Sequence, residues 1–365
     1  MLKELQPITP IHNSLWHGEF AMLALAALLL TSSAYMLLAI ITLDTAASGS
    51  VADVFPKADI VCSLAYAVGI FLFGPLCNWY VQRYRRATVC VRAIELYVAC
   101  NVVSWLVFRG FLPLHFFGIV ALRFLTGAFY GLAILVLLNT LVIDKSESAF
   151  RTRANHAMAW VMRLGMAVGP LVAIVVSRNL SLPDVCLWAM CAAMAAAVLV
   201  RLVRFPFKTP EDDLHHFSSD RFLLPSMWRL FFFTFCCFGC YGYVLSQAVS
   251  VAFYALVLVG FLWALFSERF TSVFVHSDIN LLVASFFILS AMSVFCSPDG
   301  MLPGYFTPCL LGAGIGMVGA RAQLLFIDGS GHCRRGTAVS TFLLACESGV
   351  AVGMAVGFFV TLYNS

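Results

Sequence analysis

Charged and amide side chains interrupt several of the long apolar runs in this sequence. Glu347 lies ten residues into its run, and Arg163 lies at a matching depth in an earlier one. An ionisable group inside an apolar environment is costly unless it pairs, lines water or binds something. A carboxyl can carry a proton or face a cation, a guanidinium can face an anion, and amides supply hydrogen bonds. The candidates for such chemistry are Arg123, Asn139, Arg163, Arg321, Gln323 and Glu347.

The composition indicates a membrane around these side chains. Hydrophobic residues make up 62% of the 365 positions, charged residues make up 11%, and the mean hydropathy is +0.93. That composition leaves too little polar surface for a soluble protein. The 13 cysteines show no metal-ligand spacing, and the usual nucleophile and metal motifs of enzymes are absent from the sequence. We therefore expect an all-α polytopic membrane protein that is not an enzyme, has no cofactor or metal and does not bind nucleic acid.

Eleven apolar runs are each about long enough to cross the hydrocarbon core, which takes about 20 residues. The seventh and eighth runs are separated by only a few residues, but one span of their combined length is implausible. The runs lie near 20–43, 60–81, 90–108, 114–143, 156–178, 184–204, 226–245, 249–266, 279–296, 303–326 and 337–361.

Basic residues gather in alternate connections between these runs. Because Lys and Arg are retained on the cytoplasmic side, this pattern predicts a cytoplasmic N-terminus and, with eleven helices, an external C-terminus. The basic connections follow the second run (Arg83, Arg85 and Arg86), the fourth (Lys145, Arg151 and Arg153), the sixth (Arg201 and Arg204) and the tenth (Arg334 and Arg335).

The sequence also repeats itself after a shift of 184 residues. Asp144 falls on Asp328 and Arg151 on Arg335, and several glycines and valines coincide in the helices that follow. A duplication inside a membrane chain is typical of secondary transporters. The same shift places Arg163 opposite Glu347, with opposite charge, and Asn139 opposite Gln323.

Three segments resemble motifs of the major facilitator superfamily, a family of secondary transporters. In the first, Gly74, Leu76 and Arg83 match the family's pattern for the connection between helices two and three. Asn78 stands where the family has an aspartate, and Val81 stands where it has a glycine. The family's aspartate pairs with charge between the two helix bundles. The resemblance therefore implies a gate that is weakened or rebuilt at Asn78.

The other two segments lie in helices four and five. Arg123 followed by Gly127 is similar to a helix-four motif whose arginine the family links to proton coupling. The helix-five segment resembles the family's antiporter motif, in which small residues four apart let helices approach and a proline kinks the helix. The residues expected to pack or hinge helices are Gly165, Gly169 and Pro170, with Gly349 and Gly353 as their counterparts in the repeat.

The polar stretch from 206 to 220 divides the chain near its middle. We expect the superfamily's fold of two pseudo-symmetric bundles: six helices in residues 1–204, a cytoplasmic linker in 205–224, and five helices in 225–365. Under the 184-residue shift, Ser365 falls opposite Ser181, just before the sixth helix. We therefore expect the twelfth helix of the family to be missing.

The leading functional hypothesis is proton-coupled efflux of a small organic solute by alternating access, performed by a monomer. The loop at Arg334 and Arg335 is similar to that of bacterial members of the family, particularly from Bacteroidetes, which implies a bacterial inner membrane. Two alternatives remain open. One is uptake of a sugar or other metabolite, and the other is a transporter-derived membrane protein without transport activity.

Overall fold

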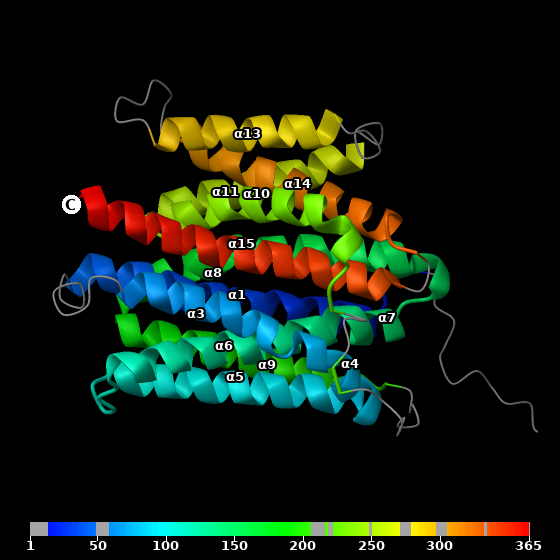
Figure 1. Ribbon diagram of the computed structural model, residues 1–365, viewed down its shortest axis with the longest axis horizontal. Coiled ribbons are helices and arrows are strands. Elements are labelled where there is room, and N and C mark those ends of the chain that lie inside the picture. The colour runs from blue at the N-terminus through cyan, green and yellow to red at the C-terminus, as the bar shows by residue number, and fades with distance from the viewer. Residues whose placement is uncertain are drawn as a thin grey trace, which may run out of the picture.

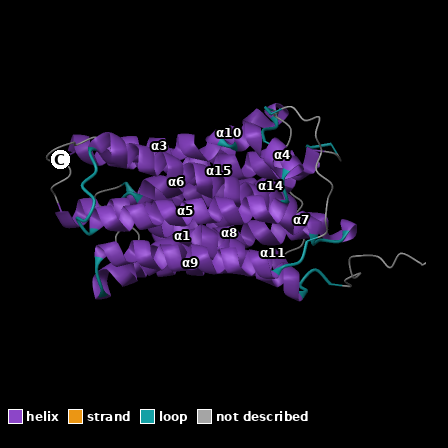
Figure 2. Ribbon diagram, turned by 90° about the horizontal axis from the view of Figure 1, so that it is seen from below, coloured by secondary structure: helices purple, strands orange, loops and turns teal. Residues whose placement is uncertain are grey.

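The computed structural model describes residues 14–48, 58–205, 216–217, 222–247, 250–270, 279–296, 305–331 and 334–364. These residues form long helices and no strands, and the helices run roughly parallel or antiparallel to one another (Figures 1 and 2). Most of the predicted linker, residues 206–215 and 218–221, lies outside the described residues. Helices suit this composition because they satisfy every backbone polar group within the segment, which an apolar solvent requires.

The chain up to residue 202 forms the helices that we call the first bundle. Its second helix is broken at Phe73 into α3 and α4, and its fourth helix contains a π-helical turn, η1. The elements are α1 (Gly18–Ser48), α3 (Ala58–Leu72), α4 (Gly74–Arg83), α5 (Arg86–Phe108), α6 (Phe116–Val136), η1 (Leu137–Leu141), α7 (Val142–Asp144), η2 (Ser148–Phe150), α8 (Arg151–Asn179) and α9 (Leu182–Leu202).

The helices from residue 225 onward are called the second bundle. They are η3 (Pro225–Met227), α10 (Trp228–Leu245), α11 (Val251–Phe270), α13 (Ile279–Phe295), α14 (Phe306–Asp328) and α15 (Arg335–Asn364). Every apolar run therefore corresponds to a helix, and the seventh and eighth runs are separate helices. Ten helical segments in the described residues are long and apolar enough to cross a membrane, and α13 is a shorter apolar helix of 17 residues.

The two bundles repeat one packing pattern. The first helix of each bundle packs on the fifth (α1 on α8, α10 on α15), and the second packs on the fourth (α3 on α6, α11 on α14). The third helix packs on the fourth in both (α5 on α6, α13 on α14). The bundles meet where the second helix of one contacts the fifth helix of the other, as α3 with α15 and α8 with α11. The recurrence in space supports the duplication inferred from the sequence.

Glycines set how closely the first and fifth helices approach. A Cβ on Gly165 would crowd Thr31 of α1, and a Cβ on Gly169 would lie 2.6 Å from the Cβ of Tyr35. On α15, Gly349 and Gly353 lie against backbone carbonyl oxygens of α10. Pro170 lies inside α8, where it removes one backbone donor. Small residues thus occupy equivalent contacts in both bundles.

Replacing Gly169 with alanine tests this packing. The added carbon has no space between α8 and α1, so the Gly169→Ala protein should lose about 1–3 kcal/mol of stability through overpacking. Thermal unfolding of the detergent-solubilised protein measures the loss. Gly331→Ala is the matched control, since no atom lies within 4 Å of a Cβ built there. Equal stability of the two variants would contradict the close contact.

Candidate functional site

The carboxyl group of Glu347 is the centre of the first polar cluster. Glu347 projects from α15 and is only 2% exposed. Tyr35 of α1 donates a hydrogen bond to its Oε2 at 3.4 Å, and Tyr130 of α6 donates one to its Oε1 at 3.2 Å. Both distances are long for hydroxyl donors, so the carboxyl is held weakly. These two bonds join the second bundle to the first in the interior of the protein.

Five buried tyrosines form what we call the tyrosine cluster around this carboxyl. The ring of Tyr66 stacks on that of Tyr130 with centroids 6.4 Å apart, and the ring centroid of Tyr97 lies 6.1 Å from that of Tyr130. Among the described residues the hydroxyl of Tyr66 has no hydrogen-bond partner. Tyr241 of α10 contacts Tyr35 and donates to the carbonyl oxygen of Met166 at 2.8 Å. The cluster consists of Tyr35, Tyr66, Tyr97, Tyr130 and Tyr241.

Sequence reasoning did not find these tyrosines, because a tyrosine inside an apolar run is not distinguishable from an ordinary membrane aromatic. The sequence nevertheless contained one indication of the tyrosine cluster. Four helices each carry one tyrosine near mid-length, and α10 carries Tyr241 and Tyr243 toward its C-terminal end; a buried phenol usually finds a polar partner. Pairing them with Glu347 required knowing which helices are neighbours.

Arg163 lies in a separate cluster at the contact between α8 and α11. Its guanidinium carbon is 4.5 Å from the ring centroid of Trp160, and its three nitrogens have no hydrogen-bond partner among the described residues. Glu268 of α11 acts on it electrostatically. The carboxyl of Glu268 accepts hydrogen bonds of 2.6 Å from both Trp160 and His156 of α8. Arg163 and Glu347 therefore occupy equivalent positions but do not pair with one another.

Asn139 and Gln323, which the repeat relates, make equivalent hydrogen bonds across the two bundles. Asn139, in the π-helical turn η1, donates through Nδ2 to the Oγ of Ser340 on α15. Gln323 of α14 donates through Nε2 to the carbonyl oxygen of Asn155 on α8, at 2.9 Å. Shifted by 184 residues, Ser340 falls beside Asn155 in the sequence. We call Asn139 and Gln323 the amide pair.

Cavities lie beside both members of the amide pair. Asn139 borders a cavity of about 460 Å³ at the end of the molecule where α8 and α15 begin. Gln323 borders a much smaller one of about 10 Å³, together with Met162 and Phe342. The amide pair thus lies between an open space at one end and the tightly packed interior.

The remaining predicted polar residues lie apart from Glu347. Arg123 of α6 is buried within the first bundle, near Cys62 of α3 and Cys186 of α9. It also lies near Tyr66 of the tyrosine cluster. Arg321 of α14 lines a largely apolar cavity of about 220 Å³ with Glu268 and aromatic side chains.

The segment that resembles the family's first motif forms the short helix α4, and the turn before α5 is only Tyr84 and Arg85. A Cβ on Gly74 would collide with the ring of Phe222, which precedes α10. The side-chain oxygen of Asn78 is buried without a hydrogen-bond partner among the described residues. Leu76 is half-buried and Arg83 is exposed. Three residues after this segment, Arg86 of α5 forms an ion pair with Asp144 of α7 at 2.5 Å, within the first bundle.

Comparison with known proteins identifies the kind of fold. The family model described as Major Facilitator Superfamily matches residues 20–354. No curated protein matches the sequence significantly. A bacterial homologue of the human lysosomal transporter Spinster, in an inward-facing and unoccupied conformation, is 16% identical with a TM-score of 0.58, covering 94% of this chain and 82% of that one.

Two further solved structures are similar. The human organic anion transporter MFSD10 is 15% identical with a TM-score of 0.67, covering 95% of this chain and 94% of that one. The POT family transporter PepTSo is 10% identical with a TM-score of 0.66, covering 95% of this chain and 90% of that one. At these identities the likeness concerns the fold alone.

A double-mutant cycle tests the bond between Tyr130 and Glu347. Removing the hydroxyl (Tyr130→Phe) and neutralising the acid (Glu347→Gln) should change the free energy of unfolding non-additively, with a coupling of roughly 0.5–3 kcal/mol. Thermal or denaturant unfolding of the four proteins supplies the values. Tyr241→Phe is the control because its hydroxyl bonds elsewhere, and its change should add to that of Glu347→Gln. Additive changes for Tyr130 would contradict the contact.

Removing both members of the amide pair should open the route between the outer cavity and the interior. The changes Asn139→Leu and Gln323→Leu remove two hydrogen bonds, each worth about 1 kcal/mol, so maleimide labelling of Met162→Cys should accelerate about tenfold or more. Mass spectrometry of the peptides measures the labelling rate at each cysteine. The rate at Ser148→Cys, in the outer cavity, is the control and should not change. An unchanged rate at position 162 would show that the amides do not restrict access.

Proposed function

Because the chain belongs to the major facilitator superfamily, it is a membrane transporter, and we propose that it moves a small organic solute by alternating access coupled to protons. Alternating access requires two bundles that rock about a site between them. We assign these bundles to residues 1–204 and 225–365, joined by the linker 205–224. The contacts of α3 with α15 and of α8 with α11 are the surfaces that part and re-form.

The observation that carries the proton coupling is the carboxyl of Glu347, buried between the bundles. In the described part of the chain its recorded polar partners are the hydroxyls of Tyr35 and Tyr130, and no ion pair is recorded for it. Such a carboxyl must either hold a proton or face a bound cation, because burying a bare charge is costly. Both tyrosines belong to the first bundle, while Glu347 belongs to the second. A change of its protonation state therefore changes the contact between bundles.

The proposed direction, efflux by antiport, rests on the helix-five segment around Gly169 and Pro170. Its resemblance to the antiporter motif is accompanied by close packing of α8 on α1, at the turn that carries Tyr35. Helix α8 thus reaches both the Glu347 cluster and, through Trp160, the cluster at α11. A helix that contacts both clusters is suited to couple them.

We place the protein in a bacterial inner membrane, with the basic helix ends in the cytoplasm. The sequence supports this orientation because basic residues gather at alternate helix ends. The ends marked by α4 and α7 lie together at one end of the molecule, and the C-terminal end of α15 lies at the other (Figure 1). A monomer contains all the residues of the proposed site.

Transport by purified protein in liposomes tests the proposal. An imposed pH gradient should drive accumulation of at least one probe from a panel of gluconate, glucose and ethidium, and a protonophore should abolish it. Glu347→Gln should reduce gradient-driven accumulation to the level of protein-free liposomes, because the carboxyl that exchanges the proton is gone. Glu95→Gln is the matched control, since Glu95 pairs with Arg92 at the surface and such pairs contribute little.

Two results would contradict this function. If the Glu347→Gln protein still accumulates the probe in response to the pH gradient, Glu347 does not exchange the coupling proton. If the wild-type protein moves the probe at the same rate with and without the gradient, transport is not coupled to protons. The sign of the gradient that drives accumulation decides between efflux and uptake.

A further inference from the structure

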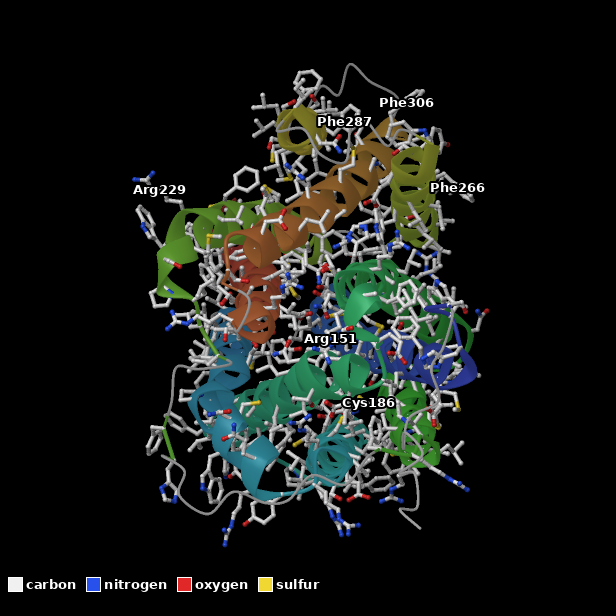
Figure 3. The ribbon with its side chains drawn as sticks, turned by 90° about the vertical axis from the view of Figure 1, so that its right-hand side faces the viewer. Arg151, Cys186, Arg229, Phe266, Phe287 and Phe306 are labelled. Carbon is white, nitrogen blue, oxygen red and sulfur yellow. The ribbon has the colours of Figure 1, made fainter. Side chains whose placement is uncertain are left out.

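The cavity of about 460 Å³ lies between the two bundles at the end where the basic residues gather, and we call it the vestibule. Its walls come from the third, fourth and fifth helices of the first bundle and the fifth helix of the second. Most of its lining side chains are polar or charged, unlike those of the apolar cavity beside Arg321. Figure 3 looks onto this end and shows Arg151 near its middle, between the bundles.

Two arginines give the vestibule its charge. Arg151, the first residue of α8, lines it from the first bundle, and Arg335, the first residue of α15, lines it from the second. The repeat relates these positions. The third arginine of the lining, Arg86, is neutralised by its ion pair with Asp144. No ion pair is recorded for Arg151 or Arg335 in the described part of the chain, so the vestibule carries an excess of positive charge.

Membrane topology alone does not explain where these two side chains lie. Arg153 and Arg334 are exposed, as Arg151 is, but neither lines the vestibule. They satisfy the preference for basic residues at cytoplasmic helix ends equally well. The placement of Arg151 and Arg335 on the cavity wall, one from each bundle, needs a different reason.

We propose that the vestibule binds the acid group of a small organic anion. Guanidinium groups bind carboxylate and phosphate oxygens through paired, charge-assisted hydrogen bonds. At the inner wall, the side-chain oxygen of Asn139 is buried and has no hydrogen-bond partner among the described residues. Ser148 and Thr152 line the same cavity and are more accessible, and their side chains can hydrogen-bond a hydroxyl on the ligand. The chemistry therefore fits a hydroxy acid or a sugar phosphate.

The site also has a place in the transport route. The bound anion would touch both bundles and would lie next to Asn139, whose amide bonds to Ser340 across the bundles. Binding in the vestibule stands on its own geometry. Assigning the anion as the transported solute rests on the proposed transport function.

Binding of gluconate to protein in phosphatidylcholine nanodiscs tests the proposal, with sorbitol as the neutral analogue. Titration calorimetry at constant ionic strength should show gluconate binding and no sorbitol binding. Arg151→Gln and Arg335→Gln should each weaken binding roughly tenfold or more, since each loses charged hydrogen bonds. The matched controls Arg153→Gln and Arg334→Gln remove the same charge from the same helix ends and should bind gluconate as the wild type does.

Other outcomes would overturn the proposal. These are absence of gluconate binding to the wild type, equal weakening by the control variants, or equal binding of sorbitol. Loss of gluconate binding in phosphatidylglycerol nanodiscs would instead mark the vestibule as a lipid-headgroup site. Glu347→Gln should still bind gluconate, so a failure of proton-coupled transport remains distinguishable from a failure of the vestibule.

Discussion

A carboxyl group with weak hydroxyl partners, enclosed between two helix bundles, is the constraint on which the rest of this structure depends. Glu347 needs partners because water is excluded, and Tyr35 and Tyr130 supply them from the opposite bundle. Glycines make that arrangement possible. Gly169 lets α8 press against the turn that carries Tyr35, and Gly127 lets α6 approach the backbone of Tyr66. The close helix packing that these glycines allow is therefore also what brings the tyrosines together around Glu347.

The two bundles share one pattern of helix packing, but the side chains at equivalent positions differ in charge and in contacts. Equivalent helices meet in both bundles, and the amide pair makes equivalent bonds across them. At the corresponding positions of the fifth helices, however, Glu347 faces tyrosine hydroxyls while Arg163 lies on the ring of Trp160. The two clusters can therefore respond to different events. The carboxyl of the Arg163 cluster, Glu268, pairs with His156, whereas no ion pair is recorded for Glu347 among the described residues.

The sequence predicted the helices well because a membrane imposes its signal on every residue of a span, and each apolar run is a helix. It also singled out Glu347, Arg163 and the amide pair as candidates, since polar groups inside apolar runs are conspicuous, and their part in a transport site stays a prediction. It did not predict the partners. Tyr130, Glu268 and their contacts depend on which helices are neighbours, and apolar periodicity carries no such information. The break at Phe73 and the π-helical turn at Asn139 were likewise invisible in composition.

We expect the protonation state of Glu347 to control how the two bundles meet. Spin-label distances between Ser148→Cys and Gly331→Cys, at exposed positions in different bundles, test it most directly when they are measured at acidic and alkaline pH. Exposed native cysteines are replaced for the measurement. We expect pH to redistribute the distances in the wild-type background and to leave a single, pH-independent distribution in Glu347→Gln. The same pH response in both proteins, or no response in the wild-type background, would contradict it.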